Sequence, residues 1–179
     1  MIAEGEVPLE RIGNSDLFEW RGEPSSVPER YRLIWRDVDH REHIAHDPYV
    51  YPPLLSQADL ELFARGAHHA PYEFLGARER EIDGVAGVLF AVWAPNAERV
   101  SVVGDFNQWD GRRHPMRVRH NGVWELFVPD LAPGALYKYE IRNRDSGALF
   151  LKADPYGRAF ERRPQTASIV PAMDTYGWN

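Results

Sequence analysis

The 179-residue chain carries 27 acidic and 21 basic side chains, for a formal net charge of −6. This balance argues against nucleic acid and anionic membranes as partners, because both call for a basic surface. There is no cysteine, which excludes disulfides, thiolate catalysis and cysteine-based zinc sites and is typical of a reducing compartment. The first residues lack the basic start and apolar run of a signal peptide, and no stretch reaches the roughly 20 apolar residues of a membrane span. We therefore expect a cytoplasmic protein; the charge is compatible with a neutral partner such as a polysaccharide, as it is with almost any other ligand.

Residues 1–53 contain short strand-like runs. One covers residues 17–20, and residues 22–28, rich in Gly, Pro and Ser, form a turn-rich connection. Tyr31, Leu33 and Trp35 then alternate with Arg32 and Ile34, which predicts a half-buried strand. So few strands do not close a sandwich. We expect this region to be part of a β-sheet whose other strands lie elsewhere.

Residues 54–76 contain the clearest helix signals. Ser56 is placed as an N-cap, with an acidic residue three positions later as in a capping box. Leu55 and Leu60 occupy the two positions of a hydrophobic staple, and Gly66 is placed to end the helix. The region is interpreted as a connector with one short helix.

Residues 77–171 read as a series of short strands separated by turn signals. No helical pattern lies between them, which is typical of an antiparallel β-sandwich. The remaining residues, 172–179, read as a linker. The expected strands lie at residues 88–93, 100–103, 123–128, 136–141, 148–151 and 168–170.

The segment from Gly87 to Asp110 resembles carbohydrate-binding module family 48, whose members precede the catalytic barrel in branching and debranching enzymes of the α-amylase group. The resemblance implies an all-β, immunoglobulin-like sandwich. It rests on Trp93-Ala94-Pro95, on Gly104-Asp105-Phe106-Asn107 with Trp109 two residues on, on Gly122-Val123-Trp124, and on Gly134 with Tyr137-Lys138-Tyr139.

Other segments are similar to bacterial glycogen branching enzymes. These are residues 110–116 after the sandwich turn, residues 152–156 with 163–168 at the module exit, and residues 47–56 with 72–76 in the connector. The region before residue 50 resembles the end of an additional N-terminal sandwich. The resemblance implies a parent enzyme that transfers α-1,4-glucan segments to form α-1,6 branches, with the catalytic barrel of the same polypeptide as a partner.

We expect the chain itself to be non-catalytic and to need no cofactor. The chemistry of these enzymes lies in a (β/α)₈ barrel, which takes roughly 250 residues, and no residue here matches its catalytic aspartates and glutamate. The chain is expected to support or orient the barrel, with α-glucan binding as a further role. The alternatives are an independent glycogen- or starch-binding module and a regulatory, glucan-sensing subunit.

The resemblance also implies a glucan site. A sugar ring packs its apolar C–H face on an aromatic plane, while its hydroxyls need directed hydrogen bonds. Trp109 matches the first aromatic platform and Lys138 matches the binding lysine, with Asn107 close enough in sequence to contribute hydrogen bonds. Phe150 stands near the position of the second platform, and Thr166 lies in the late loop.

Other residues of types that often form functional sites are interpreted as structural. Trp93 and Trp124 lie in apolar strands and are expected to pack in the core. His40, His43 and His46 recur every three residues, but such positions on a strand point to opposite faces, so no metal site is expected. Asp105 is expected to stabilise its own turn.

Overall fold

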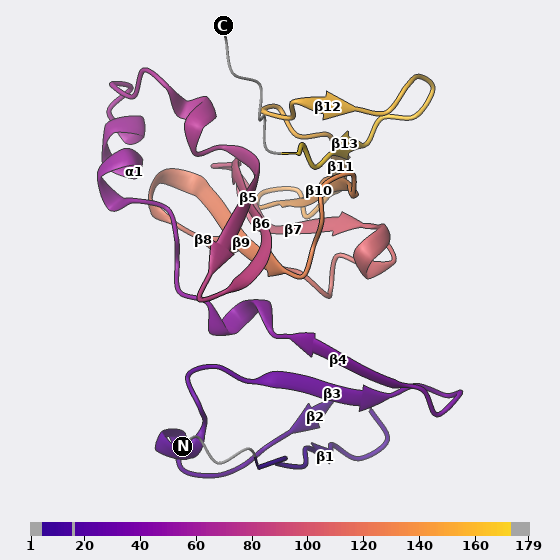
Figure 1. Ribbon diagram of the computed structural model, residues 1–179. Helices are drawn as coiled ribbons and strands as arrows, with labels where there is room; N and C mark the ends of the chain where they lie inside the picture. The colour runs from indigo at the N-terminus through magenta and orange to yellow at the C-terminus, as the bar shows by residue number, and fades with distance from the viewer. Residues whose placement is uncertain (1–4, 16, 173–179) are drawn as a thin grey trace, which may run out of the picture. The chain divides into compact units, whose positions relative to one another are not determined.

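The computed structural model describes residues 5–15 and 17–172 (Figure 1). They divide into two compact units, with the boundary between Tyr31 and Arg32. In the first unit, β1 (Glu10–Arg11) pairs antiparallel with β2 (Phe18–Glu19), and the 3-10 helix η1 (Pro24–Ser26) follows. Apart from Ala172, the linker expected at residues 172–179 lies outside the described residues.

The second unit begins with a two-stranded antiparallel hairpin. Its strands are β3 (Arg32–Arg36) and β4 (Glu42–His46). The strand expected at residues 31–35 therefore forms one residue later, but all five side chains of β3 are exposed, so the expected half-burial is wrong. In the described part of the chain this sheet has only two strands, which cannot by themselves enclose a core.

The connector contains the 3-10 helix η2 (Pro48–Val50), the helix α1 (Gln57–Ala64) and the 3-10 helix η3 (Pro71–Glu73). Ser56 is the N-cap of α1 as expected, but its side chain makes no capping hydrogen bond, so the capping box does not form. Gly66 adopts a left-handed backbone with φ +68° and donates its N–H to the Phe63 carbonyl, which ends the helix as expected. Leu60 is completely buried and anchors α1 to the rest of the unit.

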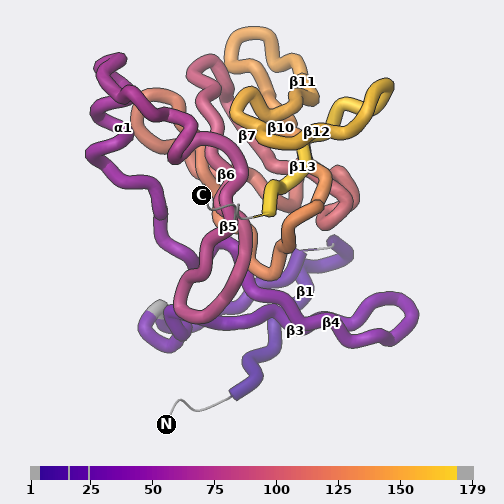
Figure 2. The backbone as a smooth tube through the Cα atoms, turned by 45° about the horizontal axis from the view of Figure 1, so that its top comes forward, coloured from indigo at the N-terminus to yellow at the C-terminus, as the bar shows by residue number. Residues whose placement is uncertain are grey.

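The remaining strands form two antiparallel sheets, as the sequence predicts. The first sheet has the order β5-β6-β9-β8, and in the second β10 is central, with β7 along one edge and β11, β13 and β12 on the other side. Figure 2 shows the C-terminal strands returning to β10. The bounds are β5 (Gly76–Ile82), β6 (Val85–Trp93), β7 (Ala97–Gly104), η4 (Asp105–Asn107), β8 (Arg117–Val118), η5 (His120–Gly122), β9 (Val123–Pro129), β10 (Leu136–Asn143), β11 (Leu149–Lys152), β12 (Ala159–Phe160) and β13 (Ser168–Ile169).

Two apolar clusters hold this arrangement together. The first fills the space between the sheets and includes Val88, Phe90, Val102, Tyr137 and Tyr139. The second lies on the other face of the β5-β6-β9-β8 sheet, where the connector covers it. Its members are Tyr51, Leu55, Leu60, Phe74, Leu75, Leu89, Ala91, Val123 and Phe127. Strand β6 is therefore buried on both faces along most of its length.

A buried carboxylate joins the connector to the sheet. Glu125 of β9 is 2% exposed and accepts hydrogen bonds from the backbone N–H groups of Leu54 and Leu55, at 3.0 and 2.9 Å. The guanidinium of Arg119 pairs with the same carboxylate, and that of Arg117 donates to the Tyr51 carbonyl. Every charge drawn into this junction is therefore hydrogen-bonded, as burial requires.

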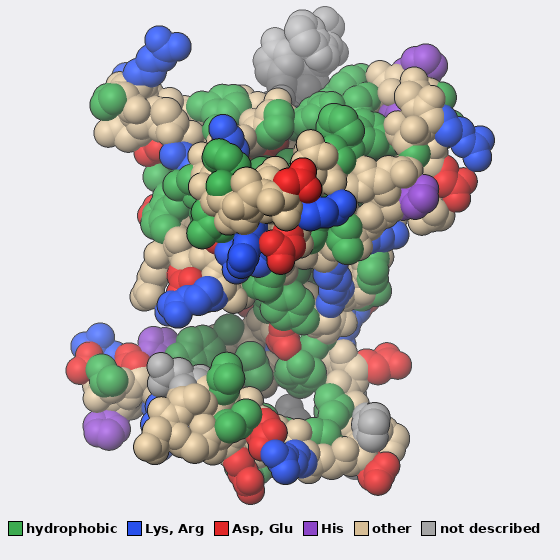
Figure 3. Space-filling view, turned by 180° about the vertical axis from the view of Figure 1, so that it is seen from behind, with side chains coloured by type: hydrophobic (Ala, Val, Ile, Leu, Met, Phe, Trp, Pro, Cys, Tyr) green, Lys and Arg blue, Asp and Glu red, His purple; other side chains and the backbone are tan. Residues whose placement is uncertain are grey.

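Among the described residues, none of the helices has the length and apolar character needed to cross a membrane. In the face drawn in Figure 3, acidic and basic side chains are interspersed with apolar ones and form no continuous basic area.

Candidate functional site

The loop after β7 turns back on itself at Gln108 and Trp109. Both residues have left-handed backbones with φ +59°, which is unusual for non-glycine residues and costs free energy. The amide N–H of Trp109 donates to the carbonyl of Gly104 at 2.9 Å, which closes the loop at the end of β7. Gly104 pairs across the sheet with Tyr137, the neighbour of Lys138. The loop thus places Trp109 at the end of β10 that carries Lys138.

Asn107 holds this loop from the inside. Its side-chain oxygen accepts from the Gly104 N–H at 2.9 Å, and its amide nitrogen donates to the Val102 carbonyl and to His114 Nδ1, both at 2.9 Å. Asn107 is only 1% exposed, so the structure places it beneath the surface and not against a ligand. It acts on the site by fixing the loop that presents Trp109.

His114 must be unprotonated at Nδ1 to accept this hydrogen bond. The Gly104 N–H and the Val102 carbonyl fix the orientation of the Asn107 amide, so its nitrogen can only donate to the ring. Burial, with a smaller contribution from the charge of Arg113, lowers the pKa of His114 below its usual value. The hydrogen-bond geometry and the burial of the ring therefore both favour the neutral imidazole.

The indole of Trp109 is fixed but remains accessible. Its Nε1–H donates to Asp105 Oδ1 at 2.7 Å, and the residue is 36% exposed. Asp105 thus stabilises its own turn, as expected, and also orients the ring. A ring held in this way pays little conformational entropy when a ligand packs on it.

Lys138 and Thr166 are brought together from distant parts of the chain. Lys138 Nζ donates to Thr166 Oγ1 at 2.7 Å, which links β10 to the loop before β13. Lys138 is half-buried and Thr166 is exposed, so both can present polar atoms to a ligand. Together with Trp109 they supply an aromatic face, an ammonium group and a hydroxyl group.

Phe150 does not join this group. It lies opposite Ile141 in the β10–β11 ladder, whereas Glu140, which shares a face with Lys138, lies opposite Leu151. Phe150 therefore points to the other face of the sheet, where it is 44% exposed. The centroid of its ring lies 5.4 Å from Lys152 Nζ. Its placement gives no second platform beside Lys138.

A buried polar network lies under Lys138. The hydroxyls of Tyr137 and Tyr139 donate to Asp154 Oδ2 at 2.7 and 3.2 Å, and the Asp154 N–H donates to Ser168 Oγ at 2.9 Å. Burial raises the pKa of Asp154 above its usual value, while the hydrogen bond from Tyr137 opposes that shift. The network fixes β10 against β13 and thereby fixes the spacing between Lys138 and the loop of Thr166.

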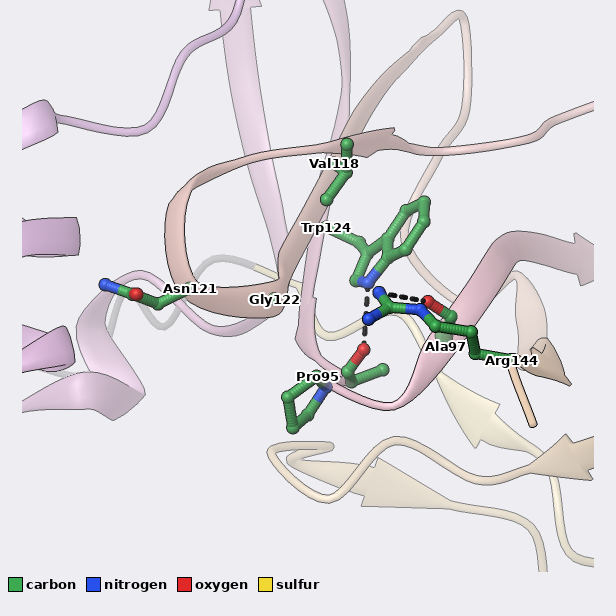
Figure 4. A pocket seen from close by; sticks show the side chains of 8 residues that line it. Pro95, Ala97, Val118, Asn121, Gly122, Trp124 and Arg144 are labelled. Carbon is green, nitrogen blue, oxygen red and sulfur yellow. Dashed lines mark hydrogen bonds between the residues drawn. The ribbon is translucent and has the colours of Figure 1, made fainter.

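A hollow of about 390 Å³ lies where β6 ends and β9 begins. The hydrogen-bond donors of its two largest polar side chains are directed to the backbone: Trp124 Nε1 donates to the Ala94 carbonyl at 3.1 Å, and Arg144 donates to the Ala97 carbonyl at 3.2 Å. The side chain of Asn121 points away from the hollow in Figure 4. No acid, base or nucleophile lines it, so it offers no catalytic chemistry. The lining residues are Ala94, Pro95, Ala97, Val118, Asn121, Gly122, Trp124 and Arg144.

The histidine series does not converge. His43 Nε2 lies 2.9 Å from Asp37 Oδ2, and His46 Nδ1 lies 2.8 Å from Asp130 Oδ2. Within the described ranges, no group of three or more acidic or histidine side chains is placed to hold a metal ion.

Trp93 differs from its expectation. Trp124 is 7% exposed and packs in the core as expected, but Trp93 is 51% exposed, so its assignment to the core is wrong. Trp93 is the last residue of β6, on the face that the connector covers only in part. Its position at the strand end, directly before Ala94 and Pro95, was the only sequence signal that could have distinguished the exposed Trp93 from the buried Trp124.

Comparison with known families supports the sequence resemblance. The family described as Carbohydrate-binding module 48 (Isoamylase N-terminal domain) matches residues 74–157. That range contains Asn107, Trp109, Lys138 and Phe150, and Thr166 lies beyond it.

Curated relatives are 1,4-α-glucan branching enzymes. The one from Cellvibrio japonicus is 54% identical over 172 residues, which cover 96% of this chain and 23% of the relative. The one from Methylococcus capsulatus is 56% identical over 172 residues, again 96% of this chain and 23% of the relative. The chain thus spans about a quarter of the length of these relatives.

Among solved structures, PulA from Klebsiella pneumoniae is similar over 55% of this chain and 9% of its own, with 25% identity and a TM-score of 0.45. A TM-score at this level carries no argument about function.

Proposed function

We propose that the chain is the non-catalytic front part of a 1,4-α-glucan branching enzyme and that it binds α-glucan at Trp109. Support comes from the match of residues 74–157 to the carbohydrate-binding module 48 family and from the similarity to branching enzymes. In this proposal the complete protein transfers α-1,4-glucan segments to form α-1,6 branches in the cytoplasm. The chain contributes no catalytic residue to that reaction.

The observation that carries the binding proposal is the fixed, accessible indole of Trp109 at the end of the strand that bears Lys138. One glucose ring would pack on the indole, and its hydroxyls would exchange hydrogen bonds with the Lys138 ammonium and the Thr166 hydroxyl. We leave Asn107 and Phe150 out of direct contact, because the first is buried and the second faces the other side of the sheet.

We also propose that the chain orients a catalytic barrel of the same polypeptide. Support comes from the junction at Glu125, which ties the connector rigidly to the sandwich. The proposal includes the domain boundaries expected from the sequence. These are residues 1–53 as part of an additional sandwich, 54–76 as connector, 77–171 as the module and 172–179 as a linker toward the barrel.

The test is a titration of the 179-residue chain with maltoheptaose, followed by calorimetry and by NMR. Trp109→Ala should weaken binding at least about tenfold, which corresponds to about 1.4 kcal/mol. Lys138→Ala should weaken it by a smaller factor, because it removes one polar partner and leaves the platform. Trp35→Ala is the matched control, since Trp35 is also an accessible tryptophan but lies on β3. Unchanged affinity in Trp109→Ala would overturn the binding proposal.

A further inference from the structure

Trp93 is the more exposed of the two accessible tryptophans of the sandwich, at 51% against 36% for Trp109. The two lie on different sheets, because Trp93 ends β6 whereas the loop of Trp109 follows β7. Trp93 pairs with Val123, which belongs to the cluster under the connector, so its side chain lies on the face away from the sandwich core. A site at Trp93 is therefore separate from the one at Trp109.

The ring of Trp93 is held on two sides. Its Nε1–H donates to the Asn121 carbonyl at 3.0 Å. Phe63 of α1 meets it edge to face, with ring centroids 5.9 Å apart and planes at 84°. Phe63 is itself held by the buried Phe74, at 5.5 Å and 85°. The indole is thus a rigid surface feature, although half of it faces solvent.

Two exposed polar residues belong to the segment that accepts the Trp93 hydrogen bond. Asn121 has a left-handed backbone with φ +56° and an exposed side chain. Within the part of the chain that the structure describes, its side-chain amide makes no hydrogen bond, and in Figure 4 it points away from the neighbouring hollow. His120, beside it, is also exposed. The amide offers two donors and an acceptor on the residue whose backbone carbonyl holds the indole.

We propose that Trp93 is a second platform for a glucose ring of an α-glucan, with the side-chain amide of Asn121 hydrogen-bonding the ring hydroxyls. A rigid indole face matches the apolar C–H face of a pyranose, and an exposed amide on the residue that holds the indole matches its equatorial hydroxyls. The choice of α-glucan over another neutral sugar rests on the proposed function. Two platforms on different sheets contact two segments of a branched polymer at once, which raises affinity for glycogen by avidity.

The experiment follows maltoheptaose binding to the 179-residue chain by NMR, at the indole N–H signals of Trp93 and Trp109. In Trp109→Ala, the Trp93 indole and the Asn121 amide should still shift and saturate with millimolar sugar. Trp93→Ala should abolish these shifts and leave the Trp109 signal responsive, and Asn121→Ala should weaken the Trp93 site about threefold to tenfold. Trp93→Phe keeps a ring without the Nε1 donor, and we expect it to retain part of the binding.

Glycogen affinity gives the second readout. Each single tryptophan variant should lower it at least about tenfold, while Trp35→Ala leaves it unchanged. A Trp93 signal that stays still while the Trp109 signal saturates would overturn this inference and leave the proposed function intact. A response at Trp93 alone would remove Trp109 from the proposed function and keep the second platform. Circular dichroism of each variant shows that the fold is retained.

Discussion

Trp93 and Trp124 lie one register step apart on neighbouring strands, and each donates its indole N–H to the chain segment that flanks the other's strand. Trp93 of β6 donates to Asn121, just before β9, and Trp124 of β9 donates to Ala94, just after β6. A backbone hydrogen bond of 2.8 Å from Ala94 N to the Gly122 carbonyl lies between them. This end of the sheet is therefore closed from both faces, with one indole buried and the other accessible.

Gly122→Ala should destabilise the protein more than an ordinary glycine replacement. Gly122 has φ +76°, and an added Cβ would lie 2.5 Å from Pro95 Cα. The left-handed backbone alone costs about 1–2 kcal/mol for a residue with a side chain, and the clash with the backbone of Pro95 adds to it. The matched control is Gly134→Ala, since Gly134 has φ +88° with nothing within 4 Å of an added Cβ. Chemical denaturation gives both values, and equal losses would contradict the close approach to Pro95.

Glu125→Ala should lower the free energy of unfolding by about 3–5 kcal/mol, the range for breaking a buried ion pair. The substitution leaves the N–H groups of Leu54 and the buried Leu55 without an acceptor and the guanidinium of Arg119 without its carboxylate. Glu125→Gln keeps an acceptor oxygen and should lose less. Glu81→Ala, an exposed site on β5, should change little. Hydrogen exchange should show the amides of Leu54 and Leu55 unprotected in Glu125→Ala, and continued protection there would contradict the proposed junction.

His114 should make the Trp109 loop sensitive to pH. The pKa of His114 is lowered in the folded state, so the unfolded chain binds a proton more readily. The stability that neutral His114 contributes is therefore present above the unfolded pKa of about 6.5 and is lost as the pH falls below it. Protonation also removes the acceptor for Asn107, so maltoheptaose affinity at Trp109 should fall between pH 7 and pH 5.

The comparison that isolates this effect is His114→Gln, which cannot titrate. Thermal unfolding and sugar titration should vary less with pH in this variant than in the unmodified chain. Identical pH profiles would show that His114 does not control the loop.

Strand positions could be predicted where a short apolar run lies between turn signals, as at Val88, Phe90 and Val92 with the apolar residues between them. What covers the other face of β6 could not be predicted, because Leu60 and Phe74 come from the connector. β5 was missed because its exposed positions carry charged side chains, such as Glu81, which weaken the apolar signal of a strand.

Within the candidate site, Lys138 and Thr166 could be placed together from the family pattern, and the structure brings their side chains into contact. Phe150 could not be placed in the same way. A shift of one residue in strand register moves a side chain to the other face of a sheet, and short motifs do not fix register that closely. The burial of Asn107 likewise follows from hydrogen bonds within a closed loop, which spacing alone does not reveal.

Tyr137→Phe should raise the pKa of Asp154 further and destabilise the protein by about 1 kcal/mol, the cost of losing one of the two hydroxyl hydrogen bonds to Oδ2 while that of Tyr139 remains. Burial already raises this pKa, and the Tyr137 hydroxyl, 2.7 Å from Oδ2, stabilises the ionised carboxylate against that effect. Because the folded pKa lies above the unfolded one, the native state binds more protons between the two values, so stability falls as the pH rises through this window. Removing the hydroxyl should widen the window toward higher pH.

An NMR titration of the Asp154 carboxyl carbon measures the pKa shift directly. The control is Tyr72→Phe, at a tyrosine that is 58% exposed. A pKa that stays the same in Tyr137→Phe would mean that Tyr139 alone sustains the charge, and that β10 is fixed against β13 by packing and backbone pairing.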